Sequence, residues 1–257
     1  MILFLSYRRT PGISSKDNTI FRLCPDDTIQ AQGIMGLLKK QNYTTIIPVV
    51  RNDVYGQELL ELVSNLSTKG NYTLTTPVYY ETGTNSFNST VDKIAESVQS
   101  VDKKTGTAVL AIGFDEVTDL LEEASQNLVL SSVPWFGTDG IALSDSVLKK
   151  KNAAEFATKT NFTATMYGEI ENEPTFMEFS KRLQNATGIK ATPYAVVIND
   201  AVQLAALTEI MSPGVTDTGP IFLDNACHFY GLSGYTSLTD FRRSKICKHR
   251  FLDRKAE

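Results

Sequence analysis

Short apolar runs alternate with segments of helical periodicity between residues 19 and 140, and this alternation most constrains the fold of the 257-residue chain. The predicted strands are the apolar runs 45–50, 72–80, 107–113 and 133–136. The predicted helices are 28–41, 55–69, 87–104 and 114–127. Strands separated by helices of this length imply crossover connections and an α/β fold with a parallel sheet. Because the strands are apolar throughout, we expect helices on both faces of that sheet.

Pro48 lies inside the first predicted strand. Proline has no backbone N–H and therefore cannot complete a ladder of hydrogen bonds on both sides of a strand. We expect a bulge or an unpaired edge at this position.

The second half of the sequence is more helical. The pattern predicts an amphipathic helix over 174–187 and a helix over 193–211 that is apolar nearly all round, which we expect to be deeply buried. Asn199 and Asp200 interrupt the apolar character of the second helix. We interpret them as a solvent-facing or capped pair rather than as catalytic residues.

Composition and charge exclude several classes of protein. The formal net charge is −4, so a surface that neutralises nucleic-acid phosphates is not expected. Three cysteines are too few for a disulfide framework, although one bridge could form. No apolar run reaches the ~18 residues of a membrane span. The first residues, Met-Ile-Leu-Phe-Leu-Ser, lack the charge order and length of a signal peptide.

Six Asn-X-Ser/Thr sequons favour an exported protein all the same. They begin at Asn42, Asn65, Asn71, Asn88, Asn161 and Asn185. This number exceeds the two or three that the composition predicts by chance, although a surface rich in Asn and Thr also produces sequons by accident. We therefore expect exposure at the surface of a glycosylating cell.

Three turns follow predicted strands, and ligands of open parallel sheets bind outside the carboxyl ends of the strands. The turns begin at Asp53, Gly113 and Gly137. They would place two aromatic side chains, Tyr55 and Phe114, beside the carboxylate of Asp139. This combination suits a cation with an apolar body, such as the ammonium group of an amino acid. The alternative is that each turn only begins a helix, with Asp115 and Asp139 as N-caps.

Enzyme motifs are sparse. The sequence contains neither G-x-G-x-x-G nor G-x-x-x-x-G-K-[ST], so phosphate binding by a glycine-rich loop has no support. Gly231-Leu232-Ser233-Gly234 lacks the spacing of a nucleophile elbow. Both histidines lie near cysteines late in the chain, but their spacing fits no usual zinc site. We predict no catalytic residues, no metal site and no cofactor.

A series of motifs resembles the type I periplasmic binding proteins, specifically the branched-chain amino-acid receptors of ABC transporters. The motifs occur in family order over roughly residues 2–240: Ile20-Phe21-Arg22-Leu23, Pro25-Asp26-Asp27, Gln30-Ala31, Asn52-Asp53-x-Tyr55-Gly56, Gly113-Phe114, Pro134-Trp135-Phe136-Gly137-Thr138-Asp139-Gly140 and Tyr230-Gly231-x-x-Gly234. Each motif is weak by itself, and their order makes the resemblance specific.

The resemblance implies roles for five residues. Ser6 and Thr10 are similar to a first-lobe loop that binds a ligand carboxylate, although Arg8 and Arg9 depart from the small residues usual there. Tyr55 is similar to an aromatic residue that closes over the ligand, and Phe114 to a second aromatic of the pocket. Asp139 occupies the position of the acid that pairs with the ligand ammonium.

The same resemblance implies two doubly wound lobes that close by a hinge, with the second lobe complete and the first partial. We expect a first-lobe remnant and crossing at 1–25, the second lobe at 26–165, helices returning to the first lobe at 166–233, and a third crossing with a basic tail at 234–257. The first strand–helix units of the family have no counterpart, and only 2–6 resembles a first-lobe strand. The sequence therefore resembles a family member truncated at its N-terminus.

The implied function is that of an extracytoplasmic solute-binding protein, which is extracellular, at the cell surface or in the periplasm, and which is not an enzyme. It would capture a small amino-acid-like ligand between its lobes and deliver it to the membrane permease of an ABC transporter, with no nucleic-acid partner. The alternatives are the ligand-binding ectodomain of a sensory receptor, an enzyme with a flavodoxin-like lobe, and a non-functional remnant.

Overall fold

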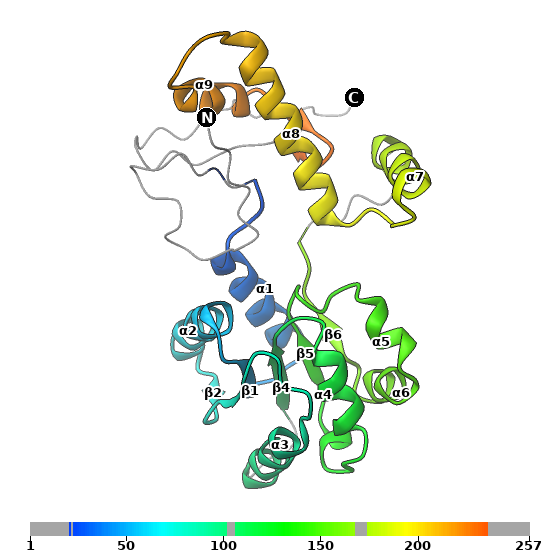
Figure 1. The fold of residues 1–257 in the computed structure, drawn as a ribbon. Helices are drawn as coiled ribbons and strands as arrows, with labels where there is room; N and C mark the ends of the chain where they lie inside the picture. Colours follow the sequence, from blue (N-terminus) through cyan, green and yellow to red (C-terminus); the bar gives the residue numbers. More distant parts are fainter. Residues whose placement is uncertain (1–20, 22, 102–105, 168–173, 236–257) are drawn as a thin grey trace, which may run out of the picture. The chain divides into compact units, whose positions relative to one another are not determined.

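A computed structural model describes residue 21 and residues 23–101, 106–167 and 174–235, drawn as a ribbon in Figure 1. The chain divides into two compact units. One unit, here the sheet unit, is Pro25–Tyr167. The other, here the helical unit, consists of Met1–Cys24 and Gly168–Glu257. Each unit is described by itself below.

A parallel sheet forms the centre of the sheet unit, as the strand and helix pattern predicts. Its strands are β1 (Thr45–Arg51), β2 (Thr73–Leu74), β3 (Val78–Tyr80), β4 (Thr107–Ile112), β5 (Trp135–Gly137) and β6 (Thr163–Ala164). The order is β2-β1-β4-β5-β6, and β3 also pairs with β1. Every pairing in this sheet is parallel, so the carboxyl ends of its strands meet at one edge.

Pro48 explains why the neighbour of β1 is divided into β2 and β3. The backbone carbonyl of Ile46 accepts a hydrogen bond from the N–H of Thr75. The backbone groups of alternate strand residues point to the same neighbouring strand, so those of Pro48 point to the same side of β1 as those of Ile46. Pro48 has no N–H to donate there. β2 pairs as far as Ile46 and β3 pairs from Val49. The expected unpaired edge is therefore present, while the other side of β1 pairs continuously with β4.

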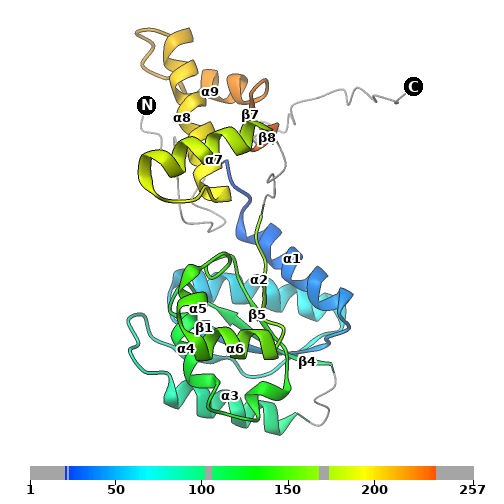
Figure 2. The same ribbon diagram turned by 90° about the vertical axis from the view of Figure 1, so that its right-hand side faces the viewer.

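Helices cover both faces of the sheet, as the apolar strands predict (Figures 1 and 2). They are α1 (Asp27–Lys40), α2 (Val54–Gly70), α3 (Asn88–Ser100), α4 (Val117–Ala124), α5 (Asp145–Lys149) and α6 (Lys151–Lys159), with a short 3₁₀ turn at Leu130–Ser132. Strand residues alternate between two apolar clusters. Ile46 and Leu110 pack with α1 and α2, whereas Ile47 and Val109 pack with α3, α4 and α6.

The described part of the helical unit contains three helices and a hairpin. These are α7 (Pro174–Thr187), α8 (Pro193–Met211), α9 (Gly219–Ala226), and the antiparallel strands β7 (Tyr230–Gly231) and β8 (Gly234–Tyr235). Its small apolar cluster joins Leu204 of α8 to Phe222 and Ala226 of α9. Phe21 packs on Phe222 with ring centroids 4.5 Å apart.

The expectation that 193–211 is deeply buried is wrong. One face of α8 is buried through Val196, Ala201 and Leu204, but Val202 is 58% exposed and Ile210 is 77% exposed. The reason is that α9 and the adjoining aromatic residues contact one face only. Of the helices that the structure describes, α8 is the one that is long and apolar enough to cross a membrane. Core helices of globular proteins often have the same length and apolar character.

Asp200 is neither solvent-facing nor a helix cap. It is fully buried on α8, which runs through this position without a break. Its carboxylate accepts hydrogen bonds from the backbone N–H of Leu232 (2.8 Å) and of Ser233 (2.7 Å), and from the Ser233 hydroxyl (2.6 Å). A side chain on Gly231 would overlap this carboxylate. Asp200 therefore holds the turn between β7 and β8, which is a structural role.

Candidate functional site

The site lies at the carboxyl edge of the sheet unit, where β1, β4 and β5 end at Arg51, Ile112 and Gly137. The loops after β4 and β5 contact each other, since the Thr138 hydroxyl donates to the carbonyl oxygen of Gly113 over 3.2 Å. A Cβ atom on Gly140 would overlap the same carbonyl group. This close approach explains the glycine after Asp139 and brings the two loops together.

Asp53 determines where Tyr55 lies. It is the N-cap of α2, and its side chain accepts a hydrogen bond from the N–H of Gly56 over 2.9 Å. A Cβ atom on Gly56 would overlap the carbonyl oxygen of Arg51 at the end of β1. The first turn of α2 is thus packed directly against the strand end, and Tyr55 stands at the edge of the sheet.

The Tyr55 hydroxyl donates to Oδ1 of Asp139 over 3.2 Å. Asp139 is only 5% exposed. Burial, and secondarily the negative charge of Asp139, raise the pKa of Tyr55 well above its usual range. The phenol therefore keeps its proton at neutral pH and acts as a hydrogen-bond donor to the carboxylate.

Phe114 completes an aromatic pair beside this carboxylate. Its ring centroid lies 4.9 Å from that of Tyr55, with the planes tilted by 34°. The guanidinium carbon of Arg51 also lies 4.9 Å from the centroid of Phe114. A cation at this distance from a ring is attracted by the π-electrons. Phe114 is therefore held between an aromatic ring and a charged group.

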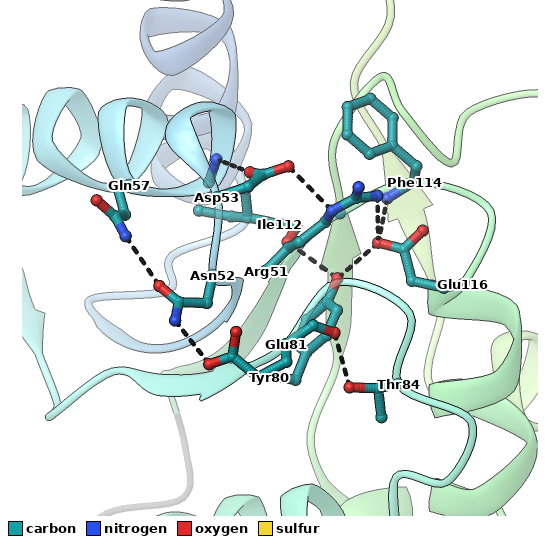
Figure 3. Close-up of polar contacts among 12 residues, drawn as sticks. Arg51, Asn52, Asp53, Gln57, Tyr80, Glu81, Thr84, Ile112, Phe114 and Glu116 are labelled. Atoms are coloured by element: carbon teal, nitrogen blue, oxygen red, sulfur yellow. Dashed lines mark hydrogen bonds and ion pairs between the residues drawn. The ribbon is translucent and has the colours of Figure 1, made fainter.

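Figure 3 shows the polar network that fixes the loop carrying Phe114. Arg51 forms ion pairs with Asp53 (3.0 Å) and with Glu116 (3.3 Å). Oε1 of Glu116 accepts from the N–H of Phe114 (3.1 Å) and from the Tyr80 hydroxyl (3.0 Å). Three strand ends, those of β1, β3 and β4, are thereby joined through one carboxylate.

The structure brings together three of the five residues expected at the site. Tyr55, Phe114 and Asp139 lie at one edge, although their binding roles stay predictions. Ser6 and Thr10 lie outside the described residues.

The alternative in which Asp115 and Asp139 serve as N-caps does not hold. The N-cap of α4 is Glu116, and the helix after Asp139 begins at Asp145 with Ser144 as its cap. Asp139 therefore needs another explanation for its burial.

Three further residues of the site were not identified from the sequence. Nε2 of Gln30, on the first turns of α1, donates to Oδ1 of Asp139. Arg51 and Glu116 support Phe114 as described above. The sequence indicates Gln30 only through its place in the Gln30-Ala31 motif. Arg51 and Glu116 are 65 positions apart, and nothing in their spacing predicts that they pair.

The arrangement provides hydrogen-bond acceptors and aromatic surface rather than reactive groups. No cluster of three His, Cys, Asp or Glu side chains suited to a metal ion occurs within residues 23–101, 106–167 and 174–235. A buried carboxylate beside two aromatic rings favours a cationic group with an apolar body.

Comparison with known proteins identifies relatives of this architecture. The family described as "Receptor family ligand binding region" matches residues 1–240. A curated but uncharacterised protein of Methanocaldococcus jannaschii is 25% identical over 202 residues, which are 78% of this chain and 46% of the relative.

Solved structures resemble the chain at 16% identity. A leucine-binding protein, LivK, of Thermotoga maritima gives a TM-score of 0.63 over 87% of this chain and 61% of the other. An ABC-transporter solute-binding protein of R. palustris in complex with benzoate gives 0.66 over 84% and 57%. An ABC-transporter substrate-binding protein of Desulfitobacterium hafniense in complex with Leu gives 0.59 over 87% and 66%. The chain thus spans roughly half to two thirds of the length of these relatives.

Proposed function

Because the chain belongs to the receptor ligand-binding-region family and has the fold of type I periplasmic binding proteins, we propose that it is an extracytoplasmic solute-binding protein for a small amino-acid-like ligand. In this role it binds its ligand without transforming it. The ligand is passed to the membrane permease of an ABC transporter, the class of system named for the R. palustris and Desulfitobacterium hafniense neighbours.

The observation that carries the proposal is the buried carboxylate of Asp139 beside the adjacent rings of Tyr55 and Phe114. A carboxylate removed from water attracts a cation more strongly than an exposed one does. An aromatic pair beside the carboxylate also favours a cation with apolar substituents. A ligand ammonium group satisfies both conditions, whereas the carboxylate of a simple aromatic acid would be repelled by Asp139.

The sequons support an extracytoplasmic location. The asparagines of all six are exposed on the described units: Asn42, Asn65, Asn71, Asn88, Asn161 and Asn185. Glycans require surface positions in an exported protein. Expression in a glycosylating host, followed by enzymatic removal of N-linked glycans, would measure which of these sites carry sugar.

Calorimetric titration of the 257-residue chain with the twenty common L-amino acids tests the ligand class. We expect saturable binding of at least one apolar amino acid at micromolar concentrations, which corresponds to a binding free energy of about −8 kcal/mol. The deaminated counterpart of that amino acid should bind at least tenfold more weakly.

Benzoate serves as the control ligand in these titrations, since it carries a carboxylate and an aromatic ring but no ammonium group. A folded chain that binds benzoate and none of the amino acids would contradict the proposal. Circular dichroism of the same sample establishes that the chain is folded.

A further inference from the structure

Gln30 is a buried amide that contacts the carboxylate at the centre of the site. It is 8% exposed, and its Nε2 donates to Oδ1 of Asp139. The Tyr55 hydroxyl donates to the same oxygen over 3.2 Å. Two donors from two helices, α1 and α2, therefore fix the orientation of the Asp139 carboxylate.

The other polar atom of the Gln30 amide has no hydrogen-bond partner among the described residues. Oε1 is buried and accepts no hydrogen bond from any residue that the structure describes. Reversing the amide would direct Oε1 at the Asp139 carboxylate, which offers no proton in its ionised form, so the network itself assigns the observed orientation. A buried acceptor without a donor is destabilising, and a donor supplied by a ligand would relieve this cost.

We propose that Gln30 is a ligand-binding residue of the amine subsite, which orients Asp139 through Nε2 and accepts a ligand N–H at Oε1. Both heteroatoms belong to one planar amide, so Oε1 lies near the Asp139 carboxylate that Nε2 contacts. This inference rests on the proposed function and makes its ligand class narrower.

The ligand is then a primary ammonium. Such a group has three N–H donors, enough for the carboxylate of Asp139 and the carbonyl of Gln30 together. A quaternary ammonium is attracted by the aromatic rings but has no N–H, so it would leave Oε1 unpaired. Sites that hydrogen-bond a substrate reject analogues that lack the matching donor by large factors.

The experiment compares Gln30→Met with Gln32→Met in the full chain. Methionine matches glutamine in length and removes the amide, and Gln32 lies on the same helix with an exposed side chain. The probes are L-leucine and N,N,N-trimethyl-L-leucine, followed by the tightest-binding member of the amino-acid panel and its trimethyl derivative. Loss of a charge-assisted hydrogen bond predicts a 10- to 100-fold weaker affinity for the primary amine in Gln30→Met. Gln32→Met should stay within twofold of the wild type.

The trimethyl derivatives distinguish a ligand contact from a structural effect. The wild type should bind them at least 100-fold more weakly than the primary amines, and Gln30→Met should reduce this preference. An unchanged affinity for the primary amine in folded Gln30→Met would overturn the role of Gln30 alone. If Gln30→Met does not fold, the wild-type series decides, and equal affinity for both forms overturns the inference. If no amino acid binds the wild type, the proposed function fails as well.

Discussion

Two tyrosines at the carboxyl edge of the sheet unit lie beside carboxylates, Tyr55 partly buried and Tyr80 fully buried. Tyr55 donates to Asp139, and the single hydroxyl proton of Tyr80 is shared between Glu116 (3.0 Å) and the carbonyl of Ile112 (3.2 Å). Burial first, and the neighbouring Glu116 second, raise the pKa of Tyr80 well above its usual range. Both tyrosine side chains act as neutral donors, so the charged groups at this edge of the sheet are the carboxylates and Arg51.

The raised pKa of Tyr80 predicts a loss of stability in alkali. Above pH ~10 the unfolded chain releases this phenolic proton while the folded chain keeps it, so the free energy of unfolding falls by up to about 1.4 kcal/mol per pH unit. Tyr80→Phe should remove this contribution and flatten the dependence between pH 10 and 11. Urea unfolding followed by circular dichroism at each pH measures the free energy of unfolding.

The control is Tyr79→Phe, at a neighbouring exposed position, which should keep the wild-type slope of the free energy of unfolding against pH. Equal slopes in the wild type and in both variants would contradict the assignment.

At the scale of elements, the sequence predicts the sheet unit well because its strands are buried on both faces and its helices have clear apolar stripes. The predicted strand 107–113 and helix 28–41 match β4 and α1 within one residue at each end. The predicted strand 72–80 divides into β2 and β3, which Pro48 on a different strand explains. A long-range cause of this kind is not visible in local periodicity.

The site is less predictable than the strands that carry it. Turns after parallel strands indicate that Tyr55, Phe114 and Asp139 lie at one edge, since topology alone places them there. The contacts of Gln30 with Asp139 and of Arg51 with Glu116 depend on side-chain packing between elements far apart in sequence. The apolar character of α8 likewise does not reveal that only one of its faces is covered.

The first turn of α1 depends on its cap. Asp26 accepts from the N–H groups of Thr28 (3.0 Å) and Ile29 (3.3 Å), and Gln30 follows directly. Asp26→Ala should lower the free energy of unfolding by about 1 kcal/mol. Trp135, the single tryptophan of the chain, is buried in the sheet unit and reports its unfolding by fluorescence. The control is Asp92→Ala at an exposed position on α3, and a loss equal to the control would refute the capping role.

At the scale of the whole molecule, the chain consists of a sheet unit with a core on both faces and a helical unit with a small core among its described residues. The sheet unit by itself carries Gln30, Tyr55, Phe114 and Asp139, which are the groups proposed to bind the ligand amine. Binding of the amine can thus be tested through residues of one unit.

A double cycle between Asp139 and the ligand amine tests the central claim most directly. Calorimetry would measure the affinities of the wild type and Asp139→Asn for L-leucine and for 4-methylpentanoate, which lacks the amine. If Asp139 binds the ammonium group, the substitution weakens leucine binding by about 3 kcal/mol or more and leaves or improves binding of the acid, so the coupling energy is large. Equal effects of the substitution on both ligands, and hence a coupling energy near zero, would contradict the account.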